Sequence, residues 1–444
     1  TASAGTSNFR AGVNAGNSIE SGGNYNVAIG DEAGTAITTG DDNTFIGIAA
    51  GYTTTTASNN TGVGRSTLLV NSTGHSNTAV GSLALTANTT GDWNVAVGYG
   101  ALDAATTADS NIAVGGNALG TCTTGTANVG VGAAALAAST TASNNTAVGF
   151  AALTATTTGN NNTAVGKSTM VTNTTGNYNT ALGYFTLNAN TTAANNTALG
   201  YNALAVNTTG ADNTAVGMLA LDANTTAAYN TAVGSNALTA NTTGAENTGV
   251  GFYSLLAATT GGNLVAVGSR ALAGNTTASN NTAVGKEALT STTTGAQNTS
   301  VGTSAMFTNT TGASNTGIGF QALYYNTTAS NNVAVGADAL KANTTGGDNT
   351  VVGSLAGDEN TTGAGLTAIG KGAATANTTA NYVTAVGGAS LDANTTGTSN
   401  TGIGYAALGA NTTGGDNTAV GVSALLVNTT GGANTAIGEN ALFS

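Results

Sequence analysis

The sequence predicts an all-β protein, a parallel β-solenoid (β-helix or β-roll) with coils of 17 residues. The motif Asn-Thr-Ala-Val-Gly, as at residues 77–81, returns with one spacing, and its glycine recurs from Gly30 to Gly438 in (438 − 30)/17 = 24 steps. An uninterrupted period is typical of repeats that stack on one another. Gly and β-branched Thr and Val fill each unit, which disfavours helix and favours short strands joined by turns.

The composition supports a folded array. The chain has 444 residues, with 66 Gly, no Pro and 6% charged residues, and 40% of it is hydrophobic. Because the apolar residues fall at fixed places in the repeat, disorder is disfavoured. We expect an irregular N-terminal coil over residues 1–25 and a continuous solenoid over residues 26–444.

Repeat positions are numbered here from the leading Asn, so Asn77 is position 1 and Trp93 is position 17. Position 4 is Val, Ile or Leu in every copy, and position 9 is usually Leu or Met. We expect these two columns to form the core, because each coil must bury its apolar residues against a neighbour. Position 9 holds small residues in four copies, where the core is expected to be thinner: Gly34, Gly51, Gly357 and Ala374.

The Asn at position 1 has two interpretations. It is replaced by Leu264, Leu366 and Val383 in three copies. These aliphatic exchanges favour a side chain that points partly inward and forms a ladder, in which each amide bonds to the next coil. Alternatively, Asn only supplies turn geometry. Thr at positions 13 and 14, such as Thr89 and Thr90, is expected to form similar ladders.

Position 3 is nearly always Ala, Gly or Ser, and only Phe45 and Val351 are larger. This restriction indicates that something approaches closely, either a turn of the same coil or a neighbouring chain. We favour the neighbouring chain. The candidate inter-chain face is Ala79, Ala96, Ala113, Gly130, Ala147 and Ala164.

Positions 6 and 7 carry the most varied side chains, including many aromatic ones. Aromatic side chains on an exposed ridge can stack on sugars or fill the pockets of a partner, which makes this the candidate adhesion face. Unconstrained surface is the simpler interpretation. The candidate residues are Tyr99, Phe150, Tyr184, Phe185, Tyr201, Phe252, Tyr253 and Phe320.

The two ends suggest a route to assembly. Counted in repeat positions, Thr1 and Ser444 both fall at position 11 if Asn8 begins a first copy with one extra residue. Open solenoid ends are unpaired edges, so matching ends predict end-to-end growth of a filament by strand addition. A chain cut from a longer protein would explain the ends equally well.

Several function classes are disfavoured. The net charge is −12, and the sequence contains no basic stripe that could bind nucleic acid. It also contains no run of about twenty apolar residues, so membrane insertion is not expected. His75, Trp93 and Cys122 each occur once, so no catalytic constellation repeats, and we expect neither enzymatic activity nor a cofactor. Six acidic residues at positions 16 and 17 are weak evidence for a metal: Asp41, Asp92, Asp109, Asp212, Asp348 and Asp416.

The run Asn-Thr-Ala-Val-Gly, Ala-Leu, Asn-Thr-Thr-Gly resembles repeats in bacterial and phage tail-fibre-like proteins, which often precede an intramolecular chaperone domain. The segment Asn26-Val27-Ala28-Ile29-Gly30 is also similar to the motif of trimeric autotransporter adhesin heads. This second resemblance implies left-handed coils, trimers and binding to host surfaces. The unit here is longer than expected for those heads.

These observations predict a non-enzymatic structural subunit of an extracellular or cell-surface fibre, in which copies assemble with one another as a filament or trimer. Surface glycans or a host-cell receptor are candidate partners. A phage tail-fibre shaft, located on the virion, is one alternative. An ice-binding solenoid is another, although positions 13 and 14 point to opposite faces and leave one outward Thr column where a grid needs two.

Overall fold

The computed structural model describes residues 5–443, and in this range it contains strands and turns but no helix. The chain is a parallel β-solenoid with coils of 17 residues, as predicted. Two compact units are distinguished, one ending at Thr226 and the other beginning at Ala227. Thr1 and Ser444, on which the end-to-end prediction depends, lie outside the described residues.

Over residues 5–226, the first unit contains thirteen three-residue strands, one in each coil. Each pairs in parallel with the next strand of the unit along the chain. The strands are β1 (Phe9–Ala11), β2 (Val27–Ile29), β3 (Thr44–Ile46), β4 (Thr61–Val63), β5 (Thr78–Val80), β6 (Val95–Val97), β7 (Ile112–Val114), β8 (Val129–Val131), β9 (Thr146–Val148), β10 (Thr163–Val165), β11 (Thr180–Leu182), β12 (Thr197–Leu199) and β13 (Thr214–Val216).

The second unit repeats this arrangement, again with one strand in each coil and parallel pairing between successive strands. Its strands are β14 (Thr231–Val233), β15 (Thr248–Val250), β16 (Val265–Val267), β17 (Thr282–Val284), β18 (Thr299–Val301), β19 (Thr316–Ile318), β20 (Val333–Val335), β21 (Thr350–Val352), β22 (Thr367–Ile369), β23 (Thr384–Val386), β24 (Thr401–Ile403), β25 (Thr418–Val420) and β26 (Thr435–Ile437).

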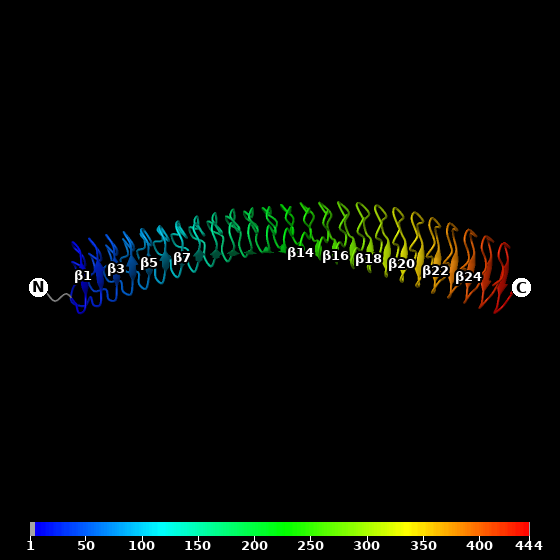
Figure 1. Cartoon of the computed structure of the whole chain (residues 1–444), viewed down its shortest axis with the longest axis horizontal. Helices are drawn as coiled ribbons and strands as arrows, with labels where there is room; N and C mark the ends of the chain where they lie inside the picture. The colour runs from blue at the N-terminus through cyan, green and yellow to red at the C-terminus, as the bar shows by residue number, and fades with distance from the viewer. Residues whose placement is uncertain (1–4, 444) are drawn as a thin grey trace. The chain divides into compact units, whose positions relative to one another are not determined.

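The strands occupy positions 2–4 and stack in register. Thr78, Ala79 and Val80 of β5 face Val95, Ala96 and Val97 of β6, one period further along the chain. Within a unit, the strands lie side by side, each in its own coil (Figure 1). Like residues are therefore placed above one another at the inter-strand spacing of about 4.8 Å. Between β1 and β2 the offset is one residue longer, since Phe9 faces Val27.

The strand directs position 3 inward and positions 2 and 4 outward. Ala79 is fully buried, whereas Thr78 and Val80 on either side of it are half-buried. The prediction that position 4 belongs to the core is therefore wrong, because alternate side chains of a strand lie on opposite faces. The other predicted core column, position 9, is confirmed by Leu85 and Met170, which are fully buried.

Position 3 is small because the interior is narrow. A Cβ atom on Gly130 would lie 3.4 Å from Cδ1 of Leu119, the position 9 residue of the preceding coil. The favoured inter-chain face is wrong for this reason, since these side chains contact the inside of their own chain. All six proposed residues are buried: Ala79, Ala96, Ala113, Gly130, Ala147 and Ala164.

Turns between the strands use left-handed backbone at residues other than glycine. Leu83, Leu85 and Trp93, at positions 7, 9 and 17, have φ of 63°, 50° and 55°. Such conformations cost about 1–2 kcal/mol each. Each of the three donates its N–H to an adjacent coil, to the carbonyls of Arg65, Ala101 and His75 respectively. These inter-coil hydrogen bonds offset the conformational cost.

The glycine at position 5 is required by both conformation and space. Gly81 has φ of +125°, and a Cβ atom there would lie 2.6 Å from the carbonyl oxygen of Gly98 in the next coil. A side chain would therefore clash with the backbone of the neighbouring coil as well as strain its own.

The Asn side chains at position 1 form the predicted ladder. Asn77 Nδ2 donates to Asn60 Oδ1 at 3.3 Å, and Asn94 Nδ2 donates to Asn77 Oδ1 at 3.1 Å. The same oxygens also accept the main-chain N–H of the next Asn, as in Asn94 N to Asn77 Oδ1 at 2.9 Å. These asparagines are fully buried, so the interpretation as turn residues alone is excluded.

In many coils a second Asn ladder, at position 12, meets the first. Asn88 Nδ2 donates to Asn71 Oδ1 at 2.9 Å and to the Gly91 carbonyl at 3.0 Å. Asn77 Nδ2 donates to the same carbonyl at 2.8 Å. Both ladders thus donate to the same carbonyl at position 15, so the buried amide groups of positions 1 and 12 have hydrogen-bond partners within the coil.

Threonine at position 13 bonds along the stack as expected, through main-chain acceptors. The Thr89 hydroxyl donates to the Thr106 carbonyl at 2.9 Å, and the Thr106 hydroxyl to the Thr123 carbonyl at 3.2 Å. Thr90, at position 14, is exposed.

Where a large side chain replaces the usual small residue at position 3, a nearby position 9 holds glycine, so the volume of the core is conserved. A Cβ atom on Gly51 would lie 2.5 Å from the Phe45 ring, and one on Gly34 would lie 3.4 Å from it. A fully buried Phe45 at position 3 therefore fills space left by two glycines at position 9. Gly357 is likewise surrounded by Leu366 and Val351. The expected thinning of the core is wrong at these glycines.

This compensation predicts coupling between Phe45 and Gly51. Phe45→Ala should lower the free energy of unfolding by about 3–5 kcal/mol through the cavity it creates. Gly51→Leu alone should also destabilise, by about 1–3 kcal/mol through overpacking. The double variant restores the usual Ala and Leu pair and should be more stable than Phe45→Ala. Denaturant unfolding of all four proteins measures the coupling, and additive losses would contradict it.

A second prediction concerns a gap in the position 12 ladder. Asn88 Oδ1 is buried without a hydrogen-bond partner, and the next coil has Ala105 at this position. Ala105→Asn supplies an amide donor to Asn88 Oδ1 and leaves its own Oδ1 opposite Cys122 without an amide donor, so stability should rise by at most about 1 kcal/mol. Ala105→Leu, which adds similar volume and no donor, is the matched control in thermal unfolding. Equal stability of the two variants would show that the ladder bond contributes nothing.

Candidate functional site

The outer face of the stacked strands is the most regular surface in each unit. From β2 onward, position 2 is Thr, Val or Ile, and position 4 is Val, Ile or Leu, so neither column contains a charge. Position 4 is unusually exposed for aliphatic residues, with 46% of Leu182, 42% of Leu199 and 38% of Ile318 accessible. Each unit thus presents a sheet face of uncharged, mostly β-branched side chains, which we call the outer sheet face.

Threonine hydroxyls on the outer sheet face differ from those at position 13. The Thr89 hydroxyl is bonded to the next coil. In contrast, the Thr78 and Thr163 hydroxyls, at position 2, have no hydrogen-bond partner within the described residues. The face therefore combines exposed methyl groups with hydroxyls that remain available to an external partner.

The residues of the candidate adhesion face lie on a different surface, along the turn after each strand. Those at position 6 are exposed, whereas Phe185 and Tyr253, at position 7, are half-buried. Five of the eight belong to the first unit and three to the second: Tyr99, Phe150, Tyr184, Phe185 and Tyr201, then Phe252, Tyr253 and Phe320. Their adhesive role stays a prediction.

Some of these rings contact one another. Tyr184 stacks on Tyr201 with ring centroids 5.8 Å apart and contacts Phe185 at 4.5 Å, while Lys167 Nζ lies 5.7 Å from the Tyr184 ring. Phe252 and Tyr253 form a separate pair at 3.9 Å. Among the candidate adhesion residues, the structure thus brings together Tyr184, Phe185 and Tyr201 in the first unit and the Phe252–Tyr253 pair in the second.

The Asp residues at positions 16 and 17 serve the backbone. Asp92 Oδ1 accepts the His75 N–H at 2.7 Å, and Asp109 Oδ1 accepts the Asp92 N–H at 2.8 Å. At position 17, Asp212 has φ of 57°, a left-handed conformation that Asp tolerates. No cluster of three or more potential metal-ligating side chains is found among residues 5–443.

The singly occurring residues have identifiable surroundings. His75 Nε2 lies 3.0 Å from Asp92 Oδ2, and its ring meets Trp93 edge-on at 5.5 Å. Cys122 is buried at position 12, where burial raises the pKa of its thiol to about 11. At neutral pH this thiol is protonated and is a poor nucleophile.

Four Asp residues share position 10, and all have a raised pKa. Burial is the main cause for Asp103, Asp222, Asp358 and Asp392. Main-chain N–H groups partly counter this effect at Asp103 and Asp392. Asp222 has burial as its sole cause.

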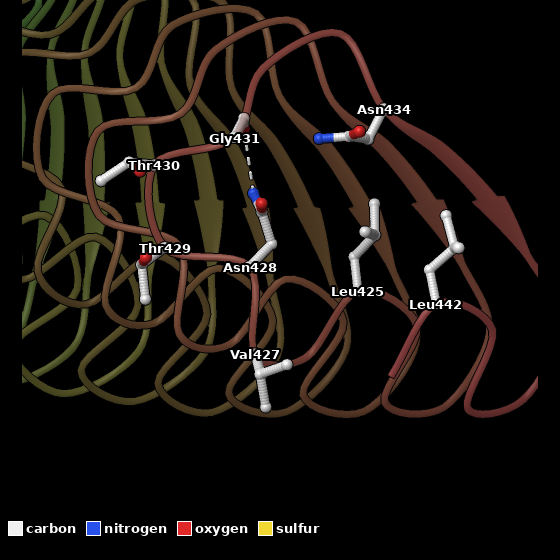
Figure 2. A pocket seen from close by; sticks show the side chains of 8 residues that line it. All are labelled: Leu425, Val427, Asn428, Thr429, Thr430, Gly431, Asn434 and Leu442. Carbon is white, nitrogen blue, oxygen red and sulfur yellow. Dashed lines mark hydrogen bonds between the residues drawn. The ribbon is translucent and has the colours of Figure 1, made fainter. Parts of the chain in front are cut away.

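A pocket in the second unit exposes side chains from repeat positions that are buried in other coils (Figure 2). It is lined by Leu425, Val427, Asn428, Thr429, Thr430, Gly431, Asn434 and Leu442. Asn428 Nδ2 bonds the Gly431 carbonyl at 3.0 Å, as position 12 does elsewhere. The pocket is thus lined largely by repeat positions 9, 12, 15 and 1, which are core positions in other coils.

Comparison with known proteins gives no functional assignment. No family model matches the chain, and no curated protein matches it. None of the described residues belongs to a helix long and apolar enough to cross a membrane.

The outer sheet face was not predicted from the sequence, because position 4 was expected in the core. A signal was present in the exceptions. Phe45 at position 3 occurs together with Gly51 at position 9 in one coil, and Val351 occurs with Gly357 in another. A large residue at one position accompanied by a small one at another indicates contact between the two. Position 3 should therefore have been assigned to the interior.

The raised pKa of Asp222 predicts a pH-dependent gain in Asp222→Asn. A carboxyl with a raised pKa in the folded state stabilises the fold below its unfolded pKa, and this contribution is lost as pH rises through the folded pKa. At pH 7 the ionised Asp222 therefore opposes folding. Asp222→Asn should raise stability by about 0.5 kcal/mol at pH 7, a typical surface effect, and by nothing near pH 3.

Thermal unfolding at both pH values tests this prediction. Asp416→Asn removes one negative charge from an exposed position of the second unit and serves as the control. An equal effect of Asp222→Asn at both pH values would show that ionisation of this group is irrelevant to stability.

Proposed function

We propose that the chain is a non-enzymatic structural subunit of an extracellular fibre, whose copies associate side by side through the outer sheet face. The observation that carries this proposal is the outward position 4 column, whose side chains are exposed or half-buried and aliphatic in every coil from β2 to β26. Exposed apolar surface that is contiguous over many residues is typical of an interaction site.

The distribution of charge supports a second copy as the partner. Acidic side chains occur at positions such as 10, 16 and 17, as in Asp222, Asp92 and Asp416, and Lys and Arg occur mainly at positions 6 and 7. Both kinds are absent from positions 2 and 4 after β1. Two such faces can meet without burying an unpaired charge. The position 2 hydroxyls can then bond across the contact.

A fibre of this kind acts by displaying its side surfaces many times, which multiplies weak contacts into firm attachment. The aromatic residues at position 6 are the candidate contacts. Cell-surface display and a place in a phage tail-fibre shaft both fit this proposal, and labelling whole cells and virions with an antibody against the chain distinguishes the two locations.

Ice binding is a second candidate, and it uses the outer sheet face. The Thr column at position 13 is unsuited, because its hydroxyls are bonded to neighbouring coils. Positions 2 and 4 instead give two outward columns, one rich in hydroxyls without internal partners and one of methyl groups. Regular spacing in two directions is the feature that a crystal surface requires.

Charges placed on the outer sheet face test the leading proposal. The variant Leu182→Lys/Leu199→Lys introduces two ammonium groups at exposed positions of adjacent strands. Burying them unpaired between copies should weaken association at least a hundredfold, or about 3 kcal/mol. Sedimentation velocity over a range of concentrations measures this. A wild-type protein that stays monomeric at the highest concentration would overturn the proposal.

The control places the same charges elsewhere on the same two coils. Thr192→Lys/Thr209→Lys alters the exposed position 14 and should leave association unchanged. Ice recrystallisation assays on the three proteins address the second candidate. Inhibition by a monomeric wild type that is lost only in the Leu182 and Leu199 variant would favour ice binding over self-association.

A further inference from the structure

A notch interrupts the position 6 ridge in the second unit, outside the predicted adhesion residues. In successive coils this column reads Lys371, Gly388 and Tyr405, so that a glycine without a side chain lies between a cation and an aromatic ring. The notch is lined by these three residues together with Leu355, Gly372, Thr375, Ala389 and Asp392. A depression with convergent polar groups and an aromatic wall is typical of a small-ligand site.

The aromatic wall is accessible and lies close to the gap. Tyr405 is 64% exposed. A Cβ atom built on Gly388 would lie 3.5 Å from Cδ2 and 3.8 Å from Cε2 of this ring. The space at Gly388 is therefore in van der Waals reach of the tyrosine, and a flat ligand that enters the notch can contact the ring.

The polar groups narrow the choice of ligand. Asp392 supplies a carboxylate, and Lys371 supplies an exposed ammonium group. The Thr375 hydroxyl already donates to the carbonyl of Gly372 at 2.8 Å, so it is left as an acceptor. A phosphate would be repelled by the carboxylate, and a purely apolar ligand would leave both charges without a partner.

We infer that this notch binds a single neutral pyranose ring of a glycan. A pyranose offers polarised C–H groups to the electron-rich face of an aromatic ring and hydroxyls that donate to a carboxylate and accept from an ammonium group. This inference names a ligand class for one place on the proposed fibre and rests on that proposal only for its biological setting. Binding itself is a property of the second unit, whatever the state of assembly.

The glycines permit a test that leaves the fold intact. Gly388 does not have the left-handed backbone of position 5, and its ideal Cβ meets other atoms at ordinary contact distances. Gly388→Leu should therefore fill the notch without strain. Gly116→Leu is the matched control, because Gly116 also stands at position 6 and its Cβ would meet nothing within 4 Å.

The probes are the methyl glycosides of glucose, galactose and mannose and of N-acetylglucosamine, measured by saturation-transfer NMR with the full chain. At least one should bind, and Gly388→Leu and Tyr405→Ala should each weaken it at least tenfold. Gly116→Leu and Tyr382→Ala, the latter at another exposed tyrosine of the second unit, should bind as the wild type does. Thermal unfolding of each variant confirms that it is folded.

Two results would overturn the inference: absence of binding by all four glycosides at millimolar concentration, or binding that folded Gly388→Leu retains. Failure of the fibre proposal would be seen separately, in sedimentation of the wild-type protein. A monomeric chain that binds a glycoside in the notch would retain this inference while removing side-by-side association.

Discussion

Hydrogen bonding along the stack is the constraint on which the rest of the structure depends. Three residues of each coil form a strand, and many of the remaining fourteen in the 17-residue period direct their polar groups to neighbouring coils through turns. The left-handed conformations at positions 7, 9 and 17 serve this purpose, because Leu83, Leu85 and Trp93 each donate to an adjacent coil. Buried asparagines continue the same pattern with side-chain amides. A regular period follows, and the one extra residue between β1 and β2 is accommodated within a single coil, since the 17-residue register holds from β2 to β3.

The second constraint is the small cross-section of each coil. A small residue at position 3 leaves space for Leu at position 9 of the preceding coil, as the 3.4 Å approach at Gly130 illustrates. Val351, which follows Leu340 in this way, is accompanied by Gly357 at position 9 of its own coil. Aliphatic residues at position 4 cannot enter this interior and are displayed outside. The narrow core therefore produces the exposed apolar face on which the proposed association depends.

The fold could be predicted from period and composition, and the Asn ladder from its aliphatic exceptions Leu264, Leu366 and Val383. Which strand positions point into the core could not be deduced from the residues at position 4 alone. In a three-residue strand, Val on one face and Ala on the other suggest the larger residue for the core, and this rule fails when the interior is too narrow for it. The notch was equally hidden, because the absence of a side chain at Gly388 matters only when Tyr405 is known to lie beside it. Distances between coils decide such sites, and the sequence does not contain them directly.

Because the coils are nearly identical, they could stack in the wrong order during folding, and Phe45 disfavours such misalignment. A nascent chain of equivalent repeats can dock a coil on the wrong neighbour, because the edge presented by one coil resembles that of any other. Phe45 breaks this equivalence. Its ring occupies space beside Gly34 and Gly51, and stacking against a coil with Leu at position 9 would force the two large side chains together. Phe45, Gly34 and Gly51 thus make their coils different from the others, and they disfavour stacking in a shifted alignment while the chain folds.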